Sequence, residues 1–135
     1  MTLQYSTTVR NAQLDAIETA IGTAAVLKIR SGAAPANCAT ADSGTVLASL
    51  TLPSDWMSAA SSGSKAKTGT WEDASADATG TAAHWRLYAS DGTTCHAQGT
   101  VTATGGGGDM TVDSTSFTSG QVFTVTGFTI TAGNA

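Results

Sequence analysis

The spacing of apolar residues changes at Gly22 from a helical period to a strand period, and this change sets the fold class. Upstream of it, apolar residues recur near the 3.6-residue period of an amphipathic helix: Val9, Leu14, Ile17 and Ile21. We therefore predict a helix over residues 8–21, with Thr7 or Thr8 as its N-cap and Gly22 as its stop. The helix is expected to cover the chain's own sheet; docking on a partner is the alternative.

Downstream of Gly22 the apolar residues alternate, or run together in short stretches bounded by turn residues. This pattern predicts strands over residues 25–30, 45–52, 66–72, 82–89, 94–104, 109–112 and 121–131. Asp91-Gly92 is typical of a hairpin turn. The expected fold is mainly β, an antiparallel β-sandwich or jelly-roll-like barrel of about seven strands with one N-terminal amphipathic helix. We expect a single domain over 1–135, with an arm and helix in 1–22 and a β domain in 23–135.

Charged side chains make up only 12% of the chain, and the formal net charge is −4. The basic residues are scattered along it: Arg10, Lys28, Arg30, Lys65, Lys67 and Arg86. Nucleic-acid binding needs clustered cations, so no nucleic-acid partner is expected. No apolar run is long enough for a membrane span, and the first residues lack the pattern of a signal peptide. We therefore expect synthesis in the cytoplasm and no membrane partner.

No arrangement of residues in the sequence favours catalysis. His84, Cys95 and His96 fall on the predicted hairpin, but adjacent strand residues point to opposite faces, which leaves too few ligands for a metal. The glycine run at 105–108 is not followed by the lysine of a phosphate-binding loop. The serines lack the pattern around a catalytic nucleophile. We predict no catalytic residue, no cofactor, no metal and no enzymatic activity.

Cys38 and Cys95 are the only cysteines, and their state is left open by the sequence. In the cytoplasm they would remain free thiols. Outside the cell a disulfide between them would tie a loop to a strand.

Three apolar residues are candidate contacts with a partner: Leu3, Tyr5 and Trp56. The segment 2–8 precedes the helix and has no core of its own to join, and chain ends are usually ordered only when something holds them. Trp56 follows Pro53 near a loop, where it is either an interface anchor or part of the core.

Four stretches resemble a group of small phage and prophage proteins: YSTTVRNAQLDAIETAIG at 5–22, ADSGTVLASLTLP at 41–53, SADATGTAAHWRLYASDGTT at 75–94 and SGQVFTVTGFTITAGNA at 119–135. The resemblance implies a virion structural protein, most specifically a capsid decoration (cement) protein. Its location would be the outer capsid surface and its partner the major capsid protein. It would form a dimer or trimer on the lattice.

Two other functions stay open. One is a tail, fibre or baseplate protein that contacts the host surface. The other is a carbohydrate-binding module, which would need an exposed aromatic platform such as Trp71, Trp85 and Tyr88.

Overall fold

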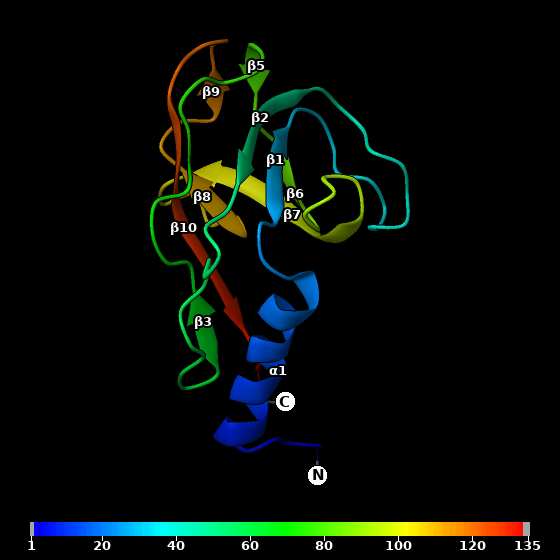
Figure 1. The fold of residues 1–135 in the computed structure, drawn as a ribbon, viewed down its shortest axis with the longest axis vertical. Coiled ribbons are helices and arrows are strands. Elements are labelled where there is room, and N and C mark those ends of the chain that lie inside the picture. The colour runs from blue at the N-terminus through cyan, green and yellow to red at the C-terminus, as the bar shows by residue number, and fades with distance from the viewer. Residues whose placement is uncertain (1, 134–135) are drawn as a thin grey trace.

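The computed structural model describes residues 2–133, in which one helix leads into a curled β body (Figure 1). The elements are α1 (Thr7–Ile21), β1 (Val26–Arg30), β2 (Val46–Thr51), β3 (Ser64–Ala66), β4 (Glu72–Asp73), β5 (Gly80–Thr81), β6 (His84–Tyr88), β7 (Cys95–Ala103), β8 (Met110–Val112), β9 (Ser116–Phe117) and β10 (Phe123–Thr131). The main sheet has the order β2-β1-β6-β7-β8-β10-β3, and β4 pairs with β10. The separate pair β5-β9 completes the described strands. This confirms a mainly β, sandwich- or barrel-like fold with an N-terminal helix.

The concave side of the curled sheet holds one continuous apolar core. Its large members are Leu27, Ile29, Leu47, Leu50, Leu52, Trp56, Met57, Trp71, Trp85, Leu87, Val101, Met110, Val112, Phe117, Phe123, Val125 and Phe128. Aromatic rings link distant segments within the core. The ring centroid of Trp71 lies 6.1 Å from that of Trp56 and 5.6 Å from that of Phe128. The ring centroids of Trp85 and Phe128 are 5.3 Å apart. Such ring pairs add to the stabilisation from their burial, so a chain with few large apolar residues still closes its core.

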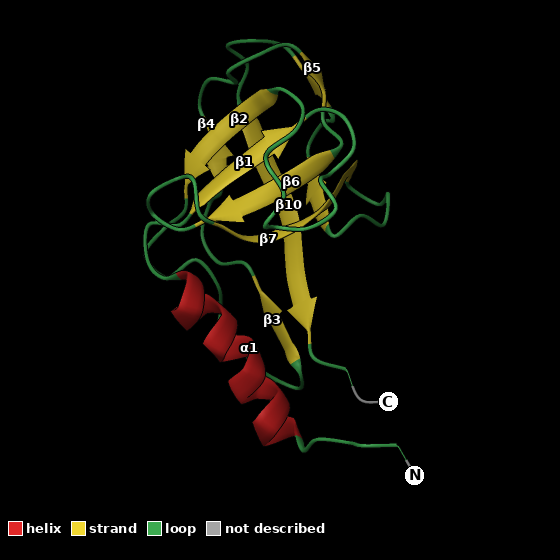
Figure 2. Ribbon diagram, turned by 90° about the vertical axis from the view of Figure 1, so that its right-hand side faces the viewer, coloured by secondary structure: helices red, strands yellow, loops and turns green. Residues whose placement is uncertain are grey.

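The helix begins one residue earlier than predicted, and its cap is Ser6 rather than Thr7 or Thr8. The Ser6 hydroxyl accepts a hydrogen bond from the Val9 N–H at 3.3 Å. At the other end Gly22 adopts a positive φ of 88°, and its N–H donates to Glu18 O. The helix runs down from the body beside β3 (Figure 2). Its packing on the chain's own strands confirms the first of the two expected positions.

Two predictions about strands are wrong in detail. Residues 66–72 do not form one strand, because Gly69 takes a positive φ of 67° and the Trp71 indole N–H donates back to Thr68 O. The chain therefore bends between β3 and β4. The second difference is that β8 runs parallel to β7, with Val101 opposite Met110, so the sheet is mixed rather than antiparallel.

Glycines explain the parallel pair. Gly105 and Gly107 have φ values of 86° and 79°, which are costly for other residues, and they let the chain double back after β7 within a short loop. The Gly108 N–H then donates to the Thr102 hydroxyl at 3.0 Å, which holds the loop against β7. β8 is short and pairs with only the C-terminal part of β7, residues 101–103.

Candidate functional site

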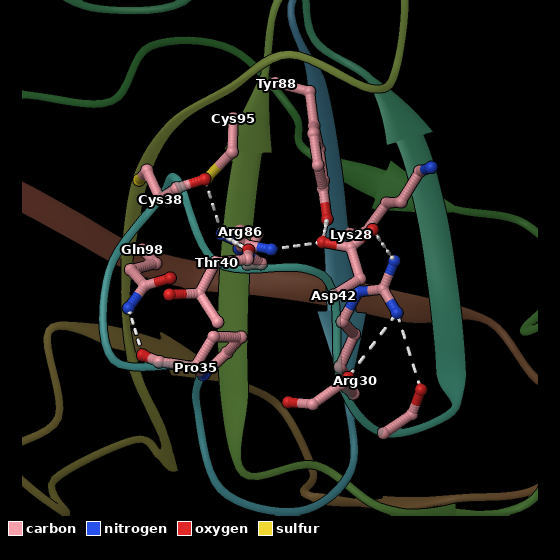
Figure 3. A network of polar contacts seen from close by, with 12 residues as sticks. Lys28, Arg30, Pro35, Cys38, Thr40, Asp42, Arg86, Tyr88, Cys95 and Gln98 are labelled. Carbon is pink, nitrogen blue, oxygen red and sulfur yellow. Dashed lines mark hydrogen bonds and ion pairs between the residues drawn. The ribbon is translucent and has the colours of Figure 1, made fainter.

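A loop of residues 31–45, here called the strap, covers the outer face of β1 and β6 (Figure 3). Its two ends are joined, since Ser31 N–H donates to Thr45 O and Thr45 N–H donates to the Ser31 hydroxyl. Because the core covers one face of β6 and the strap covers the other, every residue of β6 is buried. His84 lies under the strap with Nδ1 2.8 Å from Gly32 O.

Asp42 is the charged centre of the strap. Its carboxylate pairs with Arg30 at 2.7 Å and with Arg86, and it accepts a hydrogen bond from the Tyr88 hydroxyl at 2.7 Å. Arg30 and Arg86 are 6% and 1% exposed, whereas the Asp42 side chain is 38% exposed. Burial alone would raise the pKa of Asp42, but these hydrogen bonds and the two guanidinium charges lower it below its ordinary value. One carboxylate is thus the shared counter-charge of two buried cations.

Arg86 also serves the backbone of the strap. Its Nη2 donates to the carbonyls of Asn37, Cys38 and Thr40 at 3.2, 3.0 and 3.1 Å. Gln98 Nε2 donates to Pro35 O at 2.6 Å. These bonds satisfy carbonyls that a loop on a protein surface usually gives to water. The strap is therefore a fixed surface whose outer side carries small residues: Ala33, Ala34, Ala36, Ala39 and Ala41.

The buried phenol predicts a loss of stability in alkali. Burial, and then the hydrogen bond to Asp42, raises the pKa of Tyr88 from 10.0 to about 12. The folded chain holds this proton more tightly, so its stabilisation is complete below pH 10 and is lost between pH 10 and 12, by roughly 3 kcal/mol. We expect the urea midpoint to fall more steeply over this range than in Tyr88→Phe, which has no phenol proton. Parallel pH profiles for the two chains would contradict the assignment.

The two cysteines lie side by side at the edge of the strap (Figure 3). Both are free thiols. Burial, and then the neighbouring Cys38 thiol, raises the pKa of Cys95 to about 11. The structure therefore brings together the predicted pair, Cys38 from the strap and Cys95 from β7, while its oxidation stays a prediction.

A polar clamp fixes the helix to the body. Lys65 of β3 is 3% exposed, and its Nζ lies 2.7 Å from Asp15 and 2.9 Å from Glu18. Burial would lower the pKa of Lys65, but the hydrogen bonds to the two carboxylates outweigh it and raise the pKa. Arg10 Nε donates to Ala132 O at 2.6 Å, which ties the helix to the end of β10. The helix is thus held largely by polar contacts, and Leu14 and Ile21 are its buried residues.

Apolar side chains remain exposed on the arm (residues 2–6) and on the helix. Leu3 and Tyr5 are 70% and 43% exposed, and Val9 and Ile17 are 42% and 40% exposed. Trp56, the third predicted contact, is 1% exposed and donates its indole N–H to Gly22 O. It occupies the core position that the sequence also allowed, so it is not an anchor for a partner in this conformation.

A cavity of about 460 Å³, here called the slot, opens between α1 and the lower end of the body. Its lining comprises Leu14, Ile17, Ile21, Trp56, Met57, Trp85, Leu87, Ala97, Gln98, Asp109, Phe128, Thr129, Ile130 and Thr131. The sequence does not reveal the slot, because its walls come from the helix and from strands that are distant along the chain. It is mainly apolar and of the size of sites that bind small molecules or peptide side chains.

The remaining candidates from the sequence do not form a reactive site. Among residues 2–133, no cluster of His, Cys, Asp and Glu has the arrangement of a metal site. His84 is buried under the strap, while His96 is exposed on β7. Trp71, Trp85 and Tyr88 are all at least 96% buried, so they do not form the exposed platform that a carbohydrate-binding module needs.

Within the described part of the chain, no helix has the length and apolar character to cross a membrane. The sequence matches no protein-family model, and the comparisons found no similar curated protein and no similar solved structure. The resemblance to phage virion proteins therefore stays a prediction.

Proposed function

We propose that the protein is a structural component of a phage particle, a decoration protein that binds the outer capsid surface and braces neighbouring major capsid subunits. The observation that carries the proposal is the exposure of Leu3 and Tyr5 on an arm beyond the clamped helix. The resemblance of four stretches of sequence to small phage proteins supports the particle as the place of action. A binding role, without catalysis, follows from this assignment.

Bracing requires two separate contacts for each copy. The arm and the strap supply them, since they lie far apart, the arm at the bottom of the molecule and the strap at its upper right (Figure 1). The strap offers a fixed surface of exposed alanines, and the arm offers Leu3 and Tyr5. Each contact need not be strong, because many copies act together on a repeating lattice and mass action favours the covered shell. Association of copies as dimers or trimers belongs to the same proposal.

The test compares particles that contain the protein with particles that lack it. A ligand held at 100 times its dissociation constant stabilises its target by about 2.7 kcal/mol. We therefore expect particles without the protein to open at a lower temperature. They should also need a higher salt concentration to stay closed. Addition of purified protein to these particles should restore their stability, and addition of the Leu3→Ser/Tyr5→Ser variant should not. Equal stability of both kinds of particle would contradict the bracing role.

A further inference from the structure

The slot lies where the sheet lacks a strand. β8 pairs with only residues 101–103 of β7. Within the described chain, the N-terminal part of β7, residues 95–100, therefore has no strand on the side away from β6. The end of β10 has β3 on one side, and residues 129–131 pair with no described strand on the other. Ala97, Gln98 and the three residues Thr129, Ile130 and Thr131 line the slot, so two strand edges face it.

Hydrogen bonds on the outer side of β10 show which backbone groups point into the slot. Phe128 O accepts from Lys67 N–H and Ala132 N–H donates to Gly63 O, both on the β3 side. Backbone groups alternate along a strand, so the N–H and C=O of Thr129 and Thr131 point away from β3, toward the slot. On β7 the Thr100 N–H points away from β6 and is taken by Asp109, so by the same alternation the backbone N–H and C=O of Gln98 point toward the slot. The slot therefore presents the edges that an added strand would use.

One buried donor in the slot lining also lacks a hydrogen-bond partner. Trp85 Nε1 is buried and makes no hydrogen bond within the described structure. By contrast, the indole N–H groups of Trp56 and Trp71 donate to Gly22 O and Thr68 O. Buried polar atoms are rarely left without a partner. The indole N–H is a donor only, so the backbone carbonyl of a peptide would satisfy it.

The arm has the chemistry that such a slot would take. Ser6 is extended, with φ −61° and ψ 158°, and Leu3 and Tyr5 stand two residues apart, on one side of an extended segment. Residues 2–6 carry no charged side chain, which suits a lining whose one ionisable group, Asp109, already accepts hydrogen bonds from Thr100. The arm leads away from the helix start, whereas the helix residues of the slot are Leu14, Ile17 and Ile21, two or more turns further on (Figure 2).

We propose that the slot is a peptide-binding site and that its occupant is the arm of a second copy of this chain. Residues 2–6 of one copy lie as an added strand between β7 and β10 of the next. Leu3 and Tyr5 fill the apolar lining, and a backbone carbonyl satisfies Trp85 Nε1. This link does not depend on the proposed function. Within that function, the arm of each copy makes its contact with a neighbouring copy, and the strap makes the contact with the capsid.

Self-association of the purified full chain is the first measurement. Sedimentation or light scattering should show that molecules associate as concentration rises, and Leu3→Ser/Tyr5→Ser should stay monomeric. Val122→Ser is the matched control, because Val122 is 54% exposed but lies outside both the arm and the slot, and it should associate normally. A monomer at all concentrations, or association that the arm variant does not weaken, would overturn the proposal. Either result would leave capsid binding, measured on particles, untouched.

Nuclear magnetic resonance identifies the occupant of the slot. A synthetic peptide of residues 2–7 should shift the indole N–H resonance of Trp85 in the arm variant and leave that of Trp71 in place. The same peptide with serine at both apolar positions should have no effect. Trp85→Phe should weaken peptide binding about tenfold, the size expected for one lost hydrogen bond. A Trp85 resonance that does not respond to saturating peptide would overturn the assignment, even if the chain dimerises.

Discussion

Oxidation of Cys38 and Cys95 to a disulfide is expected to raise the free energy of unfolding by about 4 kcal/mol. The bond would close about 57 residues of chain, and the entropy removed from the unfolded state grows with the length of such a loop. Cys38 and Cys95 are neighbours in the folded chain. The disulfide would also lock the strap onto β7 after a particle leaves the reducing cytoplasm.

Oxidised glutathione is the oxidant. Each protein disulfide that forms reduces one molecule of oxidised glutathione to two molecules of the thiol. The raised pKa of Cys95 leaves little thiolate near neutral pH, so formation should be slow there and faster as the pH rises. Mass spectrometry should find a chain lighter by two hydrogens, and guanidinium unfolding should give the increase in stability. Cys38→Ser under the same conditions is the control. Two thiols that persist after prolonged exposure would contradict the prediction.

Replacement of Asp42 by asparagine is expected to lower the free energy of unfolding by about 3 kcal/mol. The variant keeps the shape of the side chain but leaves the buried guanidinium groups of Arg30 and Arg86 without a counter-charge. Loss of one partner of a buried ion pair typically costs about 3–5 kcal/mol. The lower end applies here, because Asp42 is 38% exposed and water screens part of the interaction.

Urea unfolding at neutral pH measures this loss, with Asp55→Asn, on an exposed turn, as the control. Acid provides a second signature. The pKa of Asp42 lies below its ordinary value of 3.8, so its stabilisation is complete above that pH and is lost as the pH falls through the lower, folded value. The variant should lack this part of the acid transition. A loss below 1 kcal/mol would show that the strap does not depend on Asp42.

Local pattern was enough for most of the elements. The spacing before Gly22 predicted the helix to within one residue, and alternation located β1, β2, β6, β7 and β10. The Asp91-Gly92 hairpin also formed as expected, with Ala89 N–H bonded to Thr94 O. These features depend on residues that are close in the sequence, where propensity and periodicity act directly.

The strap and the slot were beyond such reasoning. The strap reads as a loop of small residues, and nothing near Asp42 indicates that it meets Arg86, which is far along the chain. The slot exists because β8 is short and parallel, a consequence of glycines at 105 and 107 that the sequence showed only as a flexible connection. Trp56 was likewise ambiguous, because a tryptophan beside a loop serves a core and an interface equally well until its partner, here Gly22 O, is known. Each of these features is a contact between distant segments.

The most direct test of the proposed function is the location of the protein on purified particles. Cryo-electron microscopy, or gold label attached through an engineered tag, should find it on the outer capsid surface at a regular position between major capsid subunits. Particles that lack the protein should lack this density, and addition of the protein should restore it. That comparison would identify the density as the protein. Label on the tail or baseplate, or its absence from the particle, would contradict the capsid assignment.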